Sequence, residues 1–325
     1  MNKINLENIN DPVIKNLELF DSRFKESLKS NVTLVDLIAR YILRQKGKRI
    51  RPLLVLLTAK AVSDISDRTY RGAMLVELLH TATLVHDDVV DNADKRRGFW
   101  SLNVVFKNKI AVLMGDYLLS RGLSIAVDSG DFDFLSVITN TVKRMSEGEL
   151  LQIQKTRKLD IDETTYFRII SDKTASLIET CCRIGAMSAS DDADIVNAIT
   201  SYGINLGMAF QIKDDLLDYM GNSSFLGKPV GGDIKEKKIT LPLIYAFNNV
   251  EPSEVKKIKK LLRSSEDNKV KIIIDFVKAN NGLEEAMQRA EEFGNLAKKS
   301  LSVLKESESK DSLNKLIDFV INRKK

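Results

Sequence analysis

The placement of proline restricts the fold of this chain more than any other sequence feature. The chain has 325 residues and only five prolines, and none lies between Pro52 and Pro229. Proline lacks a backbone N–H and clashes with the preceding helical turn, so a long proline-free stretch permits long helices. Alternating strand patterns are absent. Apolar residues recur at helical spacing over 71–91, 131–156, 162–188 and 190–220. The sequence therefore predicts an all-α protein.

One folded domain can account for the whole chain. Hydrophobic residues make up 43% of it, which is enough for a deep core, and this length allows either two average domains or one large one. No linker divides the sequence. The glycine-rich, charged segment 221–240 is predicted to be a loop that closes over a site. We therefore expect a single domain over 1–325, built as a large helical bundle.

The charge balance and the cysteines restrict the partners and the location. A net charge of +5 suits anionic small-molecule substrates and is too weak and dispersed to indicate nucleic acid. Cys181 and Cys182 are adjacent, so they predict core positions on a helix, no disulfide framework and a cytoplasmic location. The N-terminus lacks the apolar segment of a secretory signal. No stretch approaches the roughly 20 apolar residues of a membrane span, so no transmembrane segment is expected.

Two copies of one acidic pattern carry the functional argument. Residues 87–91 and 214–218 each read Asp-Asp-x-x-Asp within an apolar helical segment. The first and last carboxylates of each copy share a helix face. Like charges there repel and raise each other's pKa unless a bound cation neutralises them. Mg²⁺ accepts one or two carboxylates and completes its shell with water and phosphate. The predicted metal ligands are Asp87, Asp88, Asp91, Asp214, Asp215 and Asp218.

A single acidic cluster is more often a solvated patch or a helix start. The cluster at 191–194 follows Ser190, and we interpret it as a helix N-terminus capped by Ser190. Two full copies inside apolar helices favour metal instead. They predict two helices that face each other across a pocket, with several Mg²⁺ ions bridging a diphosphate between them.

Basic residues near these motifs could bind that diphosphate. They gather at 46–51 before Pro52, at 95–97, at Lys173 next to Thr174, and at Lys228 and Lys238. The commoner meaning of a charge run is a solvated face, and a lysine in an apolar helix usually extends toward water.

The two histidines give too few ligands for a closed zinc site. His80 lies two turns before Asp87 on the same helix face, and we interpret it as a donor to an anion. His86 is interpreted as structural, or as supporting the residues that touch the ligand.

The order of these motifs is similar to that of a known family. Residues 47–52 read Gly-Lys-Arg-x-Arg-Pro, the first acidic motif is followed by Arg-Arg-Gly, and 115–119 read Gly-Asp-Tyr-Leu-Leu. Lys-Thr at 173–174, Phe-Gln before the second acidic motif, and Lys-x-Thr-x-Pro at 238–242 complete the set. Together they resemble the trans-polyprenyl diphosphate synthases, over residues 47–242.

The resemblance implies a helical bundle of the isoprenoid synthase type with a central cavity, a homodimer and three Mg²⁺ ions per site. Metal ligands on the allylic diphosphate would be Asp87, Asp88 and Asp91, with Asp214 opposite and Asp218 acting through water. The allylic diphosphate would be held by Arg96, Lys173 and Lys238, and isopentenyl diphosphate by Lys48, Arg51, His80 and Arg97. Gln211 would lie near the reacting carbons beside Thr174, and Lys228 would close over the site.

The reaction implied by the resemblance joins isopentenyl diphosphate to an allylic prenyl diphosphate by ionisation, condensation and deprotonation. In this family small residues one turn before the first motif permit long products, and in this sequence they are Ala82 and Thr83. We therefore expect a C30–C40 product, hexaprenyl to octaprenyl. The floor of the product tunnel is predicted near Leu123, Ile125 and Val137, although ordinary core is the commoner role of such residues.

Three alternatives remain open. A farnesyl or geranylgeranyl diphosphate synthase of the same family would make a shorter product, but the two-residue spacing within the first motif points away from the bacterial farnesyl subgroup. A terpene cyclase of the same bundle needs neither an isopentenyl site nor a second Asp-Asp-x-x-Asp motif. A non-catalytic helical partner subunit usually loses its acidic motifs, whereas this chain keeps both.

Overall fold

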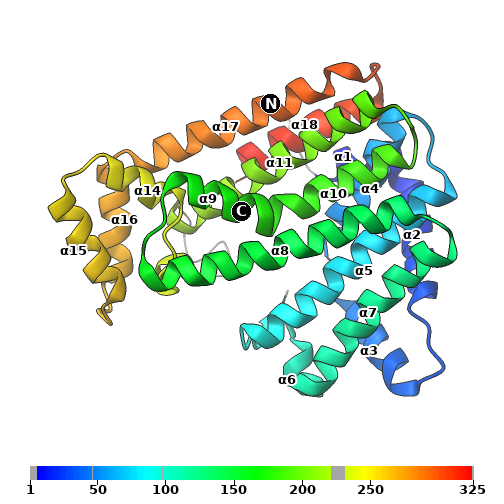
Figure 1. Cartoon of the computed structure of the whole chain (residues 1–325), viewed down its shortest axis with the longest axis horizontal. Coiled ribbons are helices and arrows are strands. Elements are labelled where there is room, and N and C mark those ends of the chain that lie inside the picture. The colour runs from blue at the N-terminus through cyan, green and yellow to red at the C-terminus, as the bar shows by residue number, and fades with distance from the viewer. Residues whose placement is uncertain (1–5, 46, 97, 221–230, 324–325) are drawn as a thin grey trace.

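The all-α prediction is confirmed by the computed structural model, which describes residues 6–45, 47–96, 98–220 and 231–323 (Figure 1). The only strands among these residues form a short antiparallel hairpin, β1 (Lys95–Arg96) and β2 (Phe99–Trp100), in which Lys95 pairs with Trp100. Sequence periodicity did not indicate this hairpin, because two residues per strand are too few to alternate. Gly98 supports the turn with a φ of +81°, a value that glycine adopts without strain.

Helices account for most of the described residues and follow one another along the chain. In chain order they are α1 (Leu6–Asn10), η1 (Asp11–Val13), α2 (Ile14–Ser27), α3 (Thr33–Arg44), α4 (Ile50–Val62), α5 (Asp67–Val90), α6 (Leu102–Phe106), α7 (Asn108–Asp128), α8 (Phe132–Lys158), α9 (Glu163–Ile170), η2 (Ser171–Ala175), α10 (Ser176–Met187), α11 (Ala193–Met220), α13 (Gly232–Lys235), α14 (Leu241–Asn248), α15 (Pro252–Arg263), α16 (Lys269–Ala279), α17 (Gly282–Ser300), η3 (Leu301–Val303) and α18 (Glu308–Asn322).

Periodicity located the long helices α5, α8 and α11 to within a few residues, but two local details differ. The predicted helix over 162–188 contains a π-helical turn, η2, between α9 and α10. The cap of α11 is Asp192 rather than Ser190, because the Asp192 carboxylate accepts hydrogen bonds from the backbone N–H groups of Asp194 and Ile195. The hydroxyl of Ser190 instead accepts from the N–H of Asp192.

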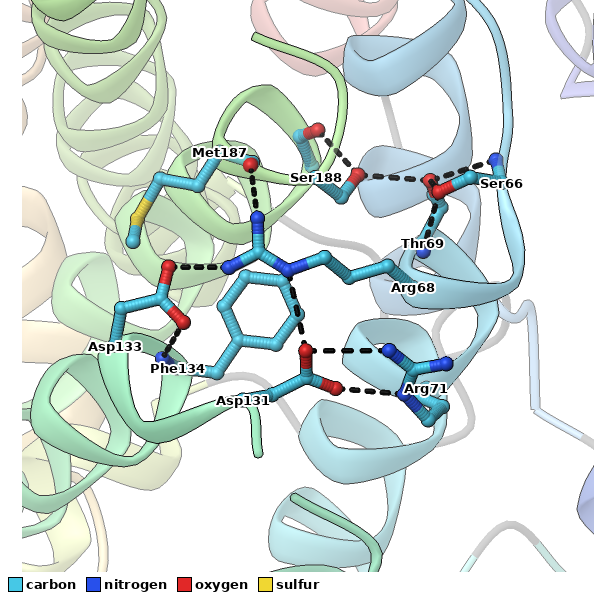
Figure 2. A network of polar contacts seen from close by, with 10 residues as sticks. Ser66, Arg68, Thr69, Arg71, Asp131, Asp133, Phe134, Met187 and Ser188 are labelled. Carbon is cyan, nitrogen blue, oxygen red and sulfur yellow. Dashed lines mark hydrogen bonds and ion pairs between the residues drawn. The ribbon is translucent and has the colours of Figure 1, made fainter. Parts of the chain in front are cut away.

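Helix α5, which carries the first acidic motif at its C-terminal end, is anchored at its N-terminal end. Ser66 and Thr69 form a capping box there. Arg68 reaches Asp131, Asp133 and the carbonyl of Met187, and Arg71 adds a bidentate pair with Asp131 (Figure 2). These contacts tie α5 to the start of α8 and the end of α10. These contacts at the N-terminal end of α5 fix the orientation of the whole helix, including the acidic motif at its other end.

Two clusters of buried apolar residues form the core. The first joins the N-terminal helices through α4, α5 and α10, and the second joins α9 to the C-terminal helices α13–α17. Helix α11 contributes buried residues to both, and Phe293 and Ile321 pack against both. Helices α17 and α18 lie along one edge of the molecule, and α15 and α16 lie at one end (Figure 1). A single domain over 1–325 stays our prediction.

Helix α7 differs from the expectation that no segment approaches a membrane span. Among the described residues it is the one helix long and apolar enough to cross a membrane by length and composition alone. Helices packed in a protein core meet the same criterion, and α7 carries residues of the first core cluster, including Met114 and Leu118. Its opposite face leaves Val112 and Leu113 exposed.

Candidate active site

The first acidic motif lies at the C-terminal end of α5. Asp87 and Asp91 are exposed, whereas Asp88 is buried and accepts a hydrogen bond of 2.7 Å from Arg96 Nε. Partial burial raises the pKa of Asp87, and the charges of Asp91 and Glu149 raise it further. The dipole of α5 also disfavours carboxylates at this helix end. The repulsion predicted for this motif is therefore present.

The second acidic motif lies at the C-terminal end of α11, and its carboxylates have different surroundings. Asp214 is exposed and pairs with the Arg323 guanidinium at 3.0 Å. Asp215 is buried and accepts hydrogen bonds from the Tyr166 hydroxyl at 2.6 Å and the Gln211 amide at 2.8 Å. Its pKa is raised well above the usual value by burial and then by the charge of Asp233.

Asp218 caps a short helix. Its two carboxylate oxygens accept hydrogen bonds of 3.0 Å each from the backbone N–H groups of Gly232 and Asp233, at the start of α13. The predicted metal ligands Asp215 and Asp218 thus have protein partners in this structure, whereas Asp87 and Asp91 face solvent.

The acidic donors of the two motifs do not form a closed metal cage. Within the described part of the chain, no three carboxylate or histidine side chains gather closely enough to hold a metal ion by themselves. Mg²⁺ does not need such a cage, since it binds through one or two carboxylates and takes its other ligands from substrate phosphate and water. Asp88 and Asp214 each pair with an arginine, whereas Asp87 and Asp91 are exposed and available to an ion. The donors are carboxylates of the kind that magnesium prefers, and they fit the ion.

A π-helical turn presents the predicted ligands Lys173 and Thr174. Such turns are rare and occur often at functional sites. Lys173 Nζ donates to Gln152 Oε1 at 2.6 Å and lies 2.5 Å from Glu149 Oε2, both on α8. The Thr174 hydroxyl donates to Gln211 Oε1 at 2.9 Å. Because the amide of Gln211 also donates to Asp215, its orientation is fixed from both ends.

The residues predicted to bind isopentenyl diphosphate line one cavity of about 570 Å³. Lys48 and Arg51 come from the turn into α4, His80 from α5 and Thr174 from η2, and the C-terminal residues Phe319 and Arg323 line it as well. Arg97, predicted for the same ligand, lies outside the described residues.

The turn that carries Lys48 and Arg51 is held in place by Arg49. This residue has a φ of +52°, and its guanidinium pairs with Glu77 at 2.9 Å and with Asp21 at 3.1 Å. These pairs anchor the turn to α5 and α2.

A smaller cavity of about 90 Å³ brings together residues predicted for the allylic diphosphate. Lys173, Lys238 and Gln211 line it together with Gln152 and Asp233. Thr174 lines both cavities, so the two adjoin at the π-helical turn. Arg96 is placed beside the first acidic motif through its bond to Asp88. Lys228, predicted to close over the site, lies outside the described residues.

Both acidic motifs border the same cluster of charges. The charge of Glu149 raises the pKa of Asp87 and, after Glu236, also that of Lys238, whose own charge lowers the pKa of the partly buried Asp233. The charges of Asp214 and Asp218, both in the second motif, raise the pKa of Asp233. Charged groups near each motif, among them Glu149, Lys238 and Asp233, therefore influence one another, and the two facing walls stay a prediction.

Several residues of the site were missed by the sequence analysis: Glu77, Glu149, Gln152, Asp233 and Arg323. Glu149 and Gln152 occupy the polar face of an amphipathic helix, where such residues usually face water. Arg323 is part of a basic run at the C-terminus, which usually indicates a solvated tail. Asp233 had a signal, since it is an acidic residue in the glycine-rich segment predicted to close over the site.

The residues predicted to control the length of the prenyl product have ordinary packing roles in the structure. Ala82 is buried, and the partly buried Thr83 donates its hydroxyl to the carbonyl of His80. Leu123, Ile125 and Val137 pack in the first core cluster. Their role in product length stays a prediction.

The other histidine, His86, lies against α7. Its Nε2 is 3.2 Å from the carbonyl of Val112 and 3.4 Å from Asp116, so its contacts join α5 to α7.

Known proteins match this chain in sequence and in fold. A model of the polyprenyl synthetase family matches residues 32–279. The chain belongs to this family. The octaprenyl diphosphate synthase of Escherichia coli (strain K12) is 35% identical over 321 residues, which cover 98% of this chain and 99% of that protein.

Solved structures of the family are similar over nearly their whole length. A decaprenyl diphosphate synthase from Rhodobacter capsulatus superposes with a TM-score of 0.92 at 31% identity, covering 98% of this chain and 99% of that one. A polyprenyl synthase from Caulobacter crescentus CB15, complexed with calcium and isoprenyl diphosphate, gives 0.90 at 29% identity, with 99% and 98% covered. The predicted family and helical-bundle fold are confirmed, and the chain is a prenyltransferase.

Proposed function

We propose that this enzyme condenses isopentenyl diphosphate with an allylic prenyl diphosphate to give a long-chain all-trans polyprenyl diphosphate. The observation that carries the proposal is the pair of cavities that share Thr174 as a lining residue. One gathers Lys48, Arg51 and His80, and the other gathers Lys173 and Lys238. Two separate basic sites are what a reaction between two diphosphates requires, whereas a terpene cyclase needs one.

The acidic motifs support a magnesium requirement. Asp87, Asp88, Asp91 and Asp214 would hold the ions, and we propose three per site. Magnesium bound there supplies Lewis-acid stabilisation of the negative charge on the leaving diphosphate. Asp87 and Asp91 are exposed and have the repulsion that a metal would relieve, whereas Arg96 and Arg323 already neutralise Asp88 and Asp214 and must give way to an ion there.

The cationic side chains of the protein assist the departure of the leaving group. Lys173, Lys238 and Arg96 bind the allylic diphosphate and stabilise the charge that it gains as the C–O bond breaks. The bonding electron pair leaves with the diphosphate and an allylic carbocation remains. Fixed donors in a partly buried site are effective because they need no reorganisation during the reaction.

The second substrate is oriented by the larger cavity. Lys48, Arg51 and His80 hold the diphosphate of isopentenyl diphosphate so that its double bond faces the cation. The double bond attacks the allylic carbon, a new C–C bond forms, and a proton then leaves to the released diphosphate. Gln211, fixed between Thr174 and Asp215, lines the smaller cavity, and we propose that it lies near the reacting carbons. No nucleophilic side chain takes part.

The product is proposed to have C30–C40 length. Ala82 and Thr83 are small, so they leave room below the first acidic motif for a growing chain. The similarity to an octaprenyl and a decaprenyl diphosphate synthase supports a long product.

The enzyme is proposed to act as a cytoplasmic homodimer. Val104 and Val105 on α6 and Val112 and Leu113 on α7 are exposed apolar residues on neighbouring helices, which a second copy would cover.

Product analysis tests the proposed function. The purified chain is incubated with Mg²⁺, farnesyl diphosphate and labelled isopentenyl diphosphate, and the products are separated by chain length. We expect C30–C40 diphosphates, and none when a chelator removes the metal. A hydrocarbon formed from farnesyl diphosphate alone would indicate a cyclase. Absence of isopentenyl diphosphate consumption by the single purified chain would contradict the proposal.

A further inference from the structure

The ammonium group of Lys173 is held by two acceptors from one helix. Its contacts are Gln152 Oε1 at 2.6 Å and Glu149 Oε2 at 2.5 Å, both on α8. An ammonium has three N–H donors, and these contacts with described residues engage two of them, so the third can bind another acceptor. The Lys173 side chain is 34% exposed, so that donor remains within reach of a ligand in the site.

The same helix also fixes the backbone that carries Lys173. Arg144 on α8 donates to Asp172, to Glu179 and to Ser171, at 2.9, 2.7 and 3.3 Å. At Gly148 the two chain segments approach so closely that a Cβ would lie 2.8 Å from the backbone nitrogen of Lys173. Arg144, Gly148 and Gln152 are four residues apart and thus form one stripe along α8. Both ends of Lys173 are therefore positioned by one face of α8.

This arrangement lies near enough to the first acidic motif to influence its charge. The charges of Lys173 and Glu149 act on Asp87 in opposite directions, the first lowering its pKa and the second raising it. Lys173 also lines the cavity that holds Lys238 and Gln211. The held ammonium consequently lies at the smaller cavity, together with other residues proposed to bind the allylic diphosphate.

We propose that Glu149 and Gln152 are positioning residues that hold the ammonium of Lys173 ready for the allylic diphosphate. An unsupported lysine samples many rotamers and must lose that freedom when it binds a ligand, whereas a lysine held by two acceptors has already lost it. The inference rests on the proposed role of Lys173 in binding the allylic diphosphate. The competing explanation is that these contacts only stabilise the packing of α8 on η2.

Steady-state kinetics with each substrate varied separately test the inference in the full-length enzyme. Gln152→Leu and Glu149→Leu remove one acceptor each, and we expect kcat/KM for farnesyl diphosphate to fall about tenfold, or ~1.4 kcal/mol. KM for isopentenyl diphosphate should stay within about twofold, a shift of less than ~0.5 kcal/mol. Glu149→Gln keeps an acceptor oxygen and should lose less than Glu149→Leu. Glu147→Gln, an exposed neighbour on α8, is the matched control and should match the unsubstituted enzyme.

A double-mutant cycle separates positioning from packing. In a Lys173→Ala background, Gln152→Leu and Glu149→Leu should cause no further loss, because the group that they position is gone. A further loss there, or equal losses for both substrates, would refute the inference, as would unchanged allylic kinetics in both leucine variants. Circular dichroism checks that each variant folds. If Gln152→Leu does not fold, the comparison of Glu149→Gln with Glu149→Leu tests the inference instead.

The same experiment distinguishes this inference from the proposed function. Normal allylic kinetics of Lys173→Ala would remove the proposed role of Lys173 itself. An impaired Lys173→Ala enzyme combined with unaffected Gln152→Leu and Glu149→Leu enzymes would remove the positioning role alone.

Discussion

The close approach of α8 to the π-helical turn makes Gly148→Ala an informative perturbation. The added Cβ would lie 2.8 Å from the backbone nitrogen of Lys173 and 3.0 Å from Cβ of Asp172. Since the nearest atom belongs to the backbone, α8 and η2 must separate. Overpacking of this kind costs about 1–3 kcal/mol, whereas replacing glycine by alanine within a helix contributes up to ~1 kcal/mol. The clash outweighs this gain over most of that range, so we expect net destabilisation of up to about 2 kcal/mol.

Gly294→Ala on α17 is the matched control. Its Cβ would meet only side-chain atoms of Ile317 and Ile321, at 3.3–3.4 Å, and these can yield by small rotations. The same substitution there should be neutral or stabilising by up to ~1 kcal/mol. Urea unfolding of the two variants measures the difference between them, and turnover with saturating substrates measures the effect on the site.

We expect a loss of both stability and activity for Gly148→Ala, and no loss of either for Gly294→Ala. Gly148→Ala should lower kcat about tenfold or more, because the displaced turn carries Lys173 and Thr174 away from the site. Gly294→Ala should leave turnover unchanged. If Gly148→Ala is as stable as Gly294→Ala and as active as the unsubstituted enzyme, the proposed link between this helix contact and the site is wrong.

Three further predictions concern the site itself. Asp87→Ala or Asp214→Ala should lower turnover by about 10³-fold or more, since each removes a ligand of the metal that stabilises the leaving group; near-normal turnover with farnesyl and isopentenyl diphosphates would refute these roles. Ala82→Phe should shorten the product, as measured by mass analysis, and an unchanged length would contradict the tunnel. Burial, and then the charge of Asp218, raises the pKa of Asp233 to about 6. Between about pH 4 and 6 the folded state then binds more protons than the unfolded state, so metal-free stability should fall as pH rises, and Asp233→Asn should flatten this slope in urea titrations with chelator.

The long helices and the acidic motifs could be predicted because their signals are local. Apolar spacing identifies α5, α8 and α11 without knowledge of their neighbours, and the repeated Asp-Asp-x-x-Asp pattern is unfavourable in a helix unless a cation binds it. The grouping of Lys48 and Arg51 with His80 came only from the family resemblance, since residues 48 and 80 lie far apart in the sequence. The structure places them around one cavity.

The π-helical turn could not be predicted, because tertiary contacts determine it. Residues 162–188 have continuous helical periodicity, and nothing in Ser171 or Lys173 indicates an inserted residue. The turn instead depends on Arg144 and Gly148, which precede it by more than 20 residues. The same limit applies to Glu149 and Gln152, whose polar side chains contact Lys173 on another helical segment.

Both acidic motifs stand at helix C-termini, where the macrodipole adds to the mutual repulsion of their carboxylates. These motifs lower the stability of the folded protein, so stability alone does not explain their presence. The structure offsets part of the cost with Arg96 on Asp88 and Arg323 on Asp214. Asp87 and Asp91 remain exposed, and the pKa of Asp87 is raised. A divalent cation that brings a diphosphate with it relieves this remaining repulsion at the place where Lys173 is already held, so metal and allylic substrate should bind cooperatively.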